Sequence, residues 1–205
     1  YNPMYNSTTP YGDATPNRVG LLLEVNNFDL SDFLSTELKT QFFTEVIGQG
    51  TTEKRFFNNT AFQSVCSIDK LLNMQNEFIL EGTLRYESVN RSGNDFESID
   101  FSSILLGGSL TYELIPNFKL LSGVKVFNAC GNEFITERDD YDQINDYLAV
   151  DFDAKETILI SGIQYDFKED IYFTMQYNHF TILENISTND EFSLGRLVFM
   201  FNINL

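Results

Sequence analysis

Alternation of apolar and polar residues with a period of two is the feature that most constrains this chain. Residues 106–114 alternate, a turn signal follows at 115–117, and the alternation resumes over 118–126. The apolar positions of the first segment are Leu106, Gly108, Leu110, Tyr112 and Leu114. This period places apolar side chains on one face of a β-strand and polar side chains on the other. The sequence therefore predicts an antiparallel hairpin with one apolar face.

The same alternation recurs in residues 77–89, in the paired segments of 157–180 and in 197–205. The second hairpin turns at 168–170, within a Lys-Glu-Asp triplet. Several such strands with intervening turns predict an all-β, antiparallel, up-and-down architecture.

Composition excludes other classes of protein. The chain has 13 Lys and Arg against 30 Asp and Glu, a net charge of −17. This charge argues against a nucleic-acid partner, because binding a polyanion needs clustered Lys and Arg residues. A chain with 42% hydrophobic residues is too apolar to be disordered. No run approaches the roughly 18 apolar residues of a membrane-spanning helix.

The connections between the expected strands alternate in length. The turns at 115–117 and 168–170 are tight, whereas the connections near 90–101, 130–155 and 184–192 are long and polar. Residues 131–156 hold nine acidic and two basic residues. Short turns at one rim and long loops at the other are typical of transmembrane β-barrels.

The two faces of the strands favour the same interpretation. The apolar face is rich in Phe, Leu, Ile and Val, and strands of 10–14 residues suit a tilted membrane crossing. Charges on the other face predict a polar network in the lumen, formed by Glu81, Arg85, Glu87, Glu113 and Lys125. Aromatic residues near the tight turns predict an interfacial girdle of Tyr112, Phe118, Tyr165, Phe167, Tyr172 and Phe173.

The hairpins 104–127 and 157–180, with the last strand, resemble the small bacterial outer-membrane β-barrel proteins over about residues 76–205. The resemblance implies an outer-membrane location, with a leader removed or not included. It implies contact with outer-membrane lipid and lipopolysaccharide. The last strand, with Phe199, Phe201 and Leu205, is similar to the strand that the barrel-assembly machinery recognises, although it ends in Leu and not Phe.

The number of crossings follows from this resemblance. The candidates are nine: 18–27, 36–47, 54–68, 76–89, 101–115, 118–129, 147–167, 170–184 and 193–205. A single-chain barrel of this class has an even number of strands. We therefore expect a transmembrane β-barrel of eight strands, with 18–27 as the extra segment; ten strands is the alternative.

The first third of the chain is less regular. Residues 1–17 contain three prolines and predict an irregular tail, followed by a single barrel domain over 18–205. Residues 31–47 and 56–72 fit both a helix and a strand. Cys66 and Cys130 form no metal-binding pattern, and the sequence leaves open whether they are bridged.

Candidate chemistry is sparse, and we expect no cofactor and no metal site. His179, with Thr181 two residues on, weakly resembles the His-x-Ser arrangement of lipid A deacylases, but Thr replaces Ser. The acidic segment 137–153 has Ca²⁺-type ligands but lacks the Gly and terminal Glu of an EF-hand loop, so a solvated loop is favoured.

The expected function is therefore non-enzymatic: a structural or accessory subunit of an outer-membrane complex, or a protein acting through acidic extracellular loops. The tail and loops are the expected contacts for protein partners. The alternatives are a narrow outer-membrane channel, an outer-leaflet lipid hydrolase around His179, and a soluble lipocalin-like carrier, which requires the opposite sidedness.

Overall fold

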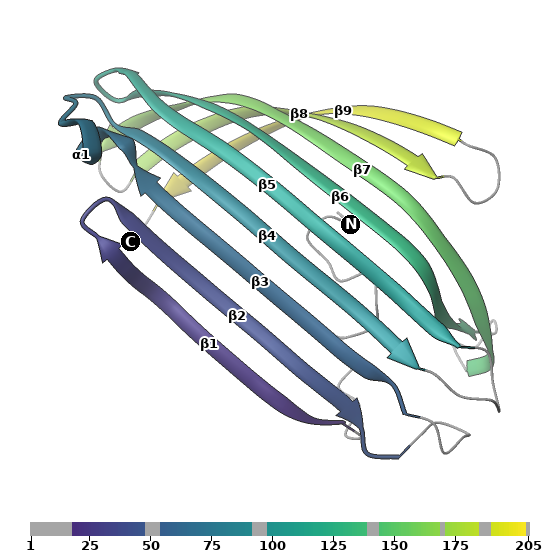
Figure 1. The fold of residues 1–205 in the computed structure, drawn as a ribbon. Helices are drawn as coiled ribbons and strands as arrows, with labels where there is room; N and C mark the ends of the chain where they lie inside the picture. Colours follow the sequence, from purple (N-terminus) through teal and green to yellow (C-terminus); the bar gives the residue numbers. More distant parts are fainter. Residues whose placement is uncertain are drawn as a thin grey trace.

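The computed structural model describes residues 18–47, 54–91, 98–138, 144–168, 171–184 and 190–203. These residues form one antiparallel sheet in which each strand pairs with its neighbours in sequence, in the order β1 to β9 (Figure 1). The strands are β1 (Arg18–Ser31), β2 (Leu34–Glu45), β3 (Phe56–Ser67), β4 (Phe78–Arg91), β5 (Ile99–Ile115), β6 (Phe118–Arg138), β7 (Ile144–Lys168), β8 (Ile171–Glu184) and β9 (Asp190–Ile203). The expected all-β, antiparallel, up-and-down architecture is confirmed.

The sheet curves into a trough, and β7 to β9 arch over the strands that precede them (Figure 1). A single sheet with no second layer can bury side chains only on its concave side. We call this side the inner face, marked by Phe101 at 0% exposure, and the convex side the outer face, marked by Leu106 at 45% exposure.

The two ends of the trough carry different connections. One end is the short-turn rim, where β1 joins β2, β5 joins β6 and β7 joins β8 through two residues each, and where β3 joins β4 through the connection that holds the helix α1 (Ile68–Leu72). The Pro116-Asn117 turn forms as expected, with Asn117 in the left-handed region at φ 69°. The opposite end, the long-connection rim, joins β2 to β3, β4 to β5, β6 to β7 and β8 to β9.

The prediction that 18–27 stands apart from eight crossings is wrong for the described residues. Arg18–Ser31 is the full strand β1, and eleven of its residues pair with β2, so the described sheet has nine strands. The alternation of Val19, Leu21 and Leu23 was sufficient evidence for a strand. Only the even number of strands expected for a single-chain barrel argues against counting these residues as a strand of the sheet.

The two ambiguous segments are resolved by pairing. Residues 34–45 and 56–67 are strands, joined to each other in continuous register from Leu34–Cys66 to Thr44–Phe56. Only Ile68–Leu72 is helical, and α1 ends at Asn73 in the left-handed conformation. Apolar residues at helical spacing, such as Leu38, Phe42 and Val46, also lie on one face of a strand, because four is a multiple of two.

The acidic connection expected over 130–155 is mostly a β-hairpin. β6 and β7 remain paired from Phe118–Tyr165 out to Arg138–Ile144. Their outer neighbours stop earlier, since β5 last pairs at Asp100–Asn132 and β8 at Ala154–Glu184. A two-stranded ribbon therefore projects beyond the long-connection rim. Its tip, residues 139–143, lies outside the described residues.

The buried hydrophobic residues gather on the inner face. They are Phe57, Val89, Ile99, Phe101, Leu105, Phe127, Ala129 and Ile158, with Phe43, Ile160 and Phe180 packed against them. They lie in the half of the trough toward the long-connection rim, where Phe57 pairs with Val89 and Val89 with Phe101. Phe127 lies in phase with Lys119 and Lys125 on the inner face and belongs to this inner apolar cluster.

Gly131 tests the backbone geometry of β6 at the point where its partner strand β5 begins. Its φ is +109°, and a Cβ built there would lie 1.8 Å from the Asp100 carbonyl oxygen. We expect Gly131→Ala to destabilise the fold by at least about 1–3 kcal/mol, the usual cost of such a backbone conformation in a non-glycine residue. Gly108→Ala is the matched control, because its Cβ would meet nothing closer than 3.9 Å. The midpoints of urea unfolding measure both effects; equal midpoints for the two variants would contradict the strained backbone at Gly131.

Candidate functional site

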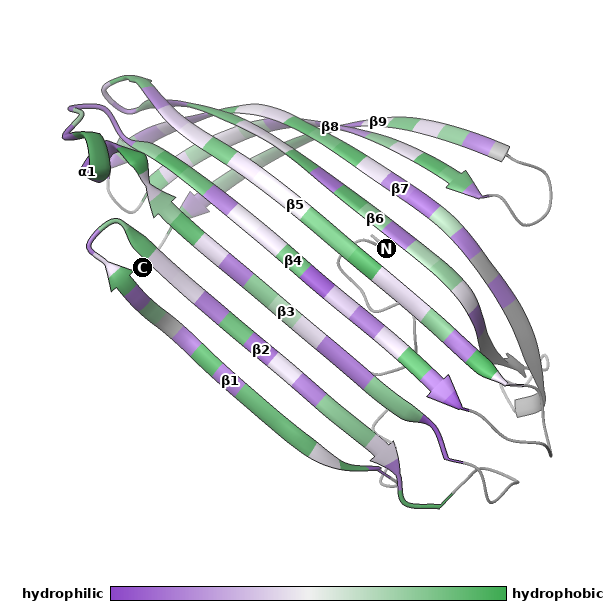
Figure 2. Ribbon diagram, in the orientation of Figure 1, coloured by the Kyte–Doolittle hydropathy of each residue, from purple (hydrophilic) through white to green (hydrophobic). Residues whose placement is uncertain are grey.

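The outer face of the sheet is apolar and exposed. Within the described residues, eight hydrophobic side chains are buried and 33 large ones are exposed; most of the exposed ones lie on the outer face, with at least one on every strand. The alternation is visible as bands of hydrophobic and hydrophilic residues along each strand (Figure 2). Leu21, Leu106 and Phe199 illustrate the exposed positions from one edge of the sheet to the other. A contiguous exposed apolar surface of this extent is characteristic of a membrane or protein interface.

Aromatic residues form a row on this outer face at the short-turn rim. The register links Phe201 to Phe173, Phe173 to Tyr165, and Tyr165 to Phe118 across β9, β8, β7 and β6. Edge-to-face contacts extend the row, with ring centroids 5.0 Å apart for Tyr165–Phe167 and 6.1 Å apart for Phe167–Phe201.

The expected girdle residues fall mostly into this arrangement. Tyr112 lies on the outer face and packs edge-to-face against Phe78, with centroids 5.7 Å apart. Tyr172 is the exception, because it pairs with Asp166 and so lies on the inner face. The sequence does not indicate that Phe78 contacts Tyr112. It also treated Phe199 and Phe201 only as part of the last strand, and Leu205 lies outside the described residues.

On the inner face, the expected charged residues separate into two groups. Glu87 is 1% exposed and is the centre of the first group. It lies 3.8 Å from the Arg85 guanidinium, accepts a hydrogen bond from Asn59 Nδ2 at 3.2 Å and one from Ser103 Oγ at 3.4 Å. Because a buried carboxylate is costly without partners, these contacts from three strands hold Glu87 in the sheet. Glu81 accepts a hydrogen bond from Ser109 Oγ at 3.0 Å.

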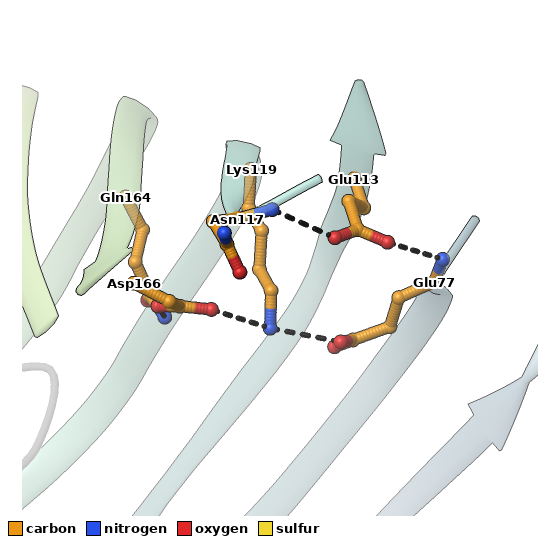
Figure 3. A network of polar contacts seen from close by, with 6 residues as sticks. All are labelled: Glu77, Glu113, Asn117, Lys119, Gln164 and Asp166. Carbon is orange, nitrogen blue, oxygen red and sulfur yellow. Dashed lines mark hydrogen bonds and ion pairs between the residues drawn. The ribbon is translucent and has the colours of Figure 1, made fainter. Parts of the chain in front are cut away.

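The second group lies at the short-turn rim and centres on Lys119 (Figure 3). Its ammonium lies 2.8 Å from Glu77 and 3.1 Å from Asp166, so one cation joins the entry to β4, β6 and β7. Glu113, a residue expected in the network, accepts hydrogen bonds from the backbone N–H of Asn117 at 3.0 Å and of Glu77 at 3.4 Å. Gln164 donates to Asp166 at 2.7 Å. These contacts tie the tight turns to one another.

Lys119 alternates with the apolar residues of the return strand 118–126, yet it is absent from the charged network that the sequence predicts. The sequence does indicate that Lys119 faces Glu113, because the two residues are equally far from the predicted turn at 115–117. Glu77 and Asp166 were harder to find, because they come from other hairpins. The pair Glu45–Arg55 was also missed: Glu45 is 3% exposed and accepts hydrogen bonds from both Arg55 Nε and Arg55 N at 2.9 Å.

Arg85 and Lys125, the remaining expected network residues, border a hollow of about 300 Å³ on the inner face of β3 to β6. Glu81, Thr83, Gln63 and Ser109 complete its polar lining. The hollow exists because Gly107 lies between Thr83 and Lys125, where a Cβ would come within 3.3 Å of the lysine side chain.

The candidate lipid-hydrolase residues are only partly brought together. His179 Nε2 lies 3.3 Å from Ser193 Oγ on the neighbouring strand β9, so Ser193, and not Thr181, is its hydroxyl partner. Within the described residues, no carboxylate hydrogen-bonds or ion-pairs with this imidazole. Cys66 and Cys130 are both free thiols.

The part of the chain that the structure describes contains no group of three or more His, Cys, Asp or Glu residues arranged to hold a metal ion. None of its helices is long and apolar enough to cross a membrane. The acidic segment 137–153 falls largely on residues whose side chains are not described.

Comparison with protein-family models, with curated proteins and with solved structures finds no match to this chain.

Lys119 provides a test of the short-turn-rim network. Its side chain is 16% exposed and has two carboxylate partners, so Lys119→Met leaves Glu77 and Asp166 without their shared cation. We expect a loss of about 1–2 kcal/mol in unfolding free energy, toward the lower end of the usual cost of removing a charged partner, because Asp166 keeps its hydrogen bond from Gln164 and Glu77 is 35% exposed. Lys39→Met is the matched control, because Lys39 is 45% exposed and lies 3.9 Å from Glu24, and such pairs contribute at most about 1 kcal/mol. Urea midpoints distinguish the two variants; a larger loss for Lys39→Met would contradict the ranking.

Proposed function

We propose that this chain is a membrane-spanning β-barrel protein of the bacterial outer membrane, acting as a non-enzymatic structural or accessory subunit. The observation that carries the proposal is the sidedness of the sheet. Its outer face exposes large hydrophobic residues on every described strand, while its inner face holds the buried Glu87 and the Lys119 ion pairs. This is the distribution that lipid outside and polar groups inside require.

The same sidedness disfavours a soluble carrier. In a lipocalin-like barrel the apolar positions line a cavity, and the outer face is polar. Here the outer residues of β5 and β9 are exposed hydrophobics such as Leu106 and Phe199, and burying them requires either lipid or another protein. The row of aromatic residues at the short-turn rim supports lipid, because Tyr and Phe in such rows lie at the membrane interface.

A bilayer assay with paired substitutions tests membrane insertion. Leu106 and Ser109 lie three residues apart in β5 and point to opposite faces. We expect Leu106→Lys to reduce folding into lipid vesicles by about 2–4 kcal/mol, the cost of a Lys on the lipid face at mid-depth. We expect Ser109→Lys to fold nearly as well as the unaltered chain, because the inner face is polar there and Glu81 is adjacent.

Folding is measured by heat-modifiable gel mobility after reconstitution. Equal effects of Leu106→Lys and Ser109→Lys would contradict the assignment of the outer face to lipid. An unaltered chain that stays in the aqueous phase without detergent, with no heat-modifiable band, would refute the membrane proposal as a whole.

The packing of the inner face supports a barrel whose lumen is filled by side chains, in preference to the alternative of a narrow channel. Phe57, Phe101 and Phe127 fill the inner face toward the long-connection rim, each at 1% exposure or less. An interior occupied by packed phenyl rings has no continuous water path at that level.

Planar-bilayer recording tests this second point. We expect the reconstituted chain to give no steady single-channel current, since the inner apolar cluster blocks the lumen. Steady unitary currents would favour the channel over the structural subunit. Under that result, Phe101→Ser should increase the conductance, whereas Phe199→Ser on the outer face should leave it unchanged.

A further inference from the structure

The helix α1, at the short-turn rim beyond the end of β3, exposes its apolar side (Figure 1). At about 100° per residue, Ile68, Leu71 and Leu72 fall within one arc of about 100°, and Lys70 lies about 160° from Leu72. Leu71 is 47% exposed and Leu72 is 62% exposed. A helix on a water-covered surface turns its apolar side to the protein, so α1 has the opposite arrangement.

The polar side of α1 faces the interior of the curved sheet. Lys70 borders a hollow of about 550 Å³ that Asp29 and Val65 also line. Val65 pairs with Glu81 of the inner face, so this hollow lies on the inner side of the sheet. Because Lys70 points to the inner side of the rim, Leu72, on the opposite side of the helix, points outward from it.

Neighbouring residues extend this exposed apolar surface along the rim. Met74 follows α1 and is 38% exposed, and at the end of β5 Leu114 and Ile115 are 49% and 59% exposed. Asn76 Nδ2 donates a hydrogen bond to the Glu113 carbonyl oxygen at 3.0 Å, which holds the α1 connection beside the end of β5. We call the exposed apolar residues of these two segments the rim patch: Leu71, Leu72, Met74, Leu114 and Ile115.

Lipid is the occupant that the surroundings of the rim patch favour. Phe78, which begins β4 directly after the α1 connection, packs edge-to-face against Tyr112 on the outer face. Aromatic residues in such a row lie at a membrane interface, so lipid that contacts Phe78 also reaches the rim patch. Amphipathic helices in an interface bury their apolar side at the boundary between headgroups and acyl chains, which is the side that α1 exposes.

We propose that the rim patch inserts into the lipid leaflet at the short-turn rim, with α1 lying in the interface as an anchor. The anchor rests on the proposed membrane location of the sheet and adds a lipid contact outside the strands. Leu71 and Leu72 lie among the acyl-chain carbons nearest the headgroups, while Lys70 stays on the inner side of the rim. This contact fixes the depth of the protein in the bilayer at β3, β4 and β5.

Tryptophan fluorescence tests the contact directly, because the chain contains no Trp. Single-Trp variants are reconstituted into phosphatidylcholine nanodiscs, with and without bromine on the acyl chains, since bromine quenches a Trp that it contacts. We expect brominated lipid to quench Leu72→Trp several-fold. Lys70→Trp, on the opposite side of the same helix, is the matched control; it should be quenched weakly and emit at a longer wavelength. Equal quenching of the two variants would contradict the sidedness of α1.

Leu106→Trp separates the anchor from the proposed function, because Leu106 lies on the outer face at the middle of β5. Quenching of Leu106→Trp without quenching of Leu72→Trp would refute the anchor and leave the membrane location intact. Absence of quenching in both variants would refute the membrane location itself.

Aqueous iodide identifies what covers Leu72→Trp if lipid does not, since nanodiscs leave both rims open to solvent. Iodide quenching would show that the rim patch faces water. Protection from both iodide and brominated lipid would show that another protein or a second copy of the chain covers it. Either result overturns the lipid contact.

A second measurement tests whether the two leucines hold the segment in lipid, with Met74→Trp as the reporter. We expect Leu71→Ser combined with Leu72→Ser to reduce the quenching of Met74→Trp by brominated lipid several-fold. Lys70→Ser combined with Gln75→Ser is the control and should leave the quenching unchanged. The heat-modifiable band should persist in all these variants, because α1 lies outside the sheet. Equal quenching in the leucine and control backgrounds would refute an anchoring role for Leu71 and Leu72.

Discussion

Backbone hydrogen bonding between sequence neighbours is the constraint on which the rest of this structure depends. The described residues form one sheet with no second layer, so each strand has only the two adjacent strands to satisfy its backbone. The curvature of the sheet creates the inner face, and the alternation along each strand determines which side chains enter it. The outer apolar surface and the inner polar groups both follow from this single arrangement.

Two kinds of contact fill the inner face of the curved sheet. Toward the long-connection rim, phenyl rings from Phe57, Phe101 and Phe127 pack together. Toward the short-turn rim, Lys119 and its two carboxylates join hairpins that are distant in sequence. Buried charges in such a setting need several partners each, and the arrangement of Glu87 among Arg85, Asn59 and Ser103 meets that need.

Much of the fold could be predicted from local pattern. The hairpins around Pro116-Asn117 and 168–170 have clean alternation and recognisable turns, and both form as expected. The segments 31–47 and 56–72 could not be assigned, because apolar residues four apart suit both periods. The acidic segment over 130–155 was misjudged, because charged residues on a two-stranded ribbon beyond the rim need no apolar face. The candidate network was predicted only where its members share a hairpin or a strand.

By itself, the sequence determined which residues share a face, where the tight turns form, and that one face is apolar while the other is charged. A period of two is a local property of each strand, so it does not depend on which strand lies beside it. Only the tertiary structure decided that residues 18–31 pair with residues 34–45, that phenyl rings cluster on the inner face toward the long-connection rim while Lys119 joins two carboxylates at the short-turn rim, and that β1 and β9 run in the same direction. These features depend on contacts between residues far apart in sequence, since curvature and register bring together side chains that no local pattern relates.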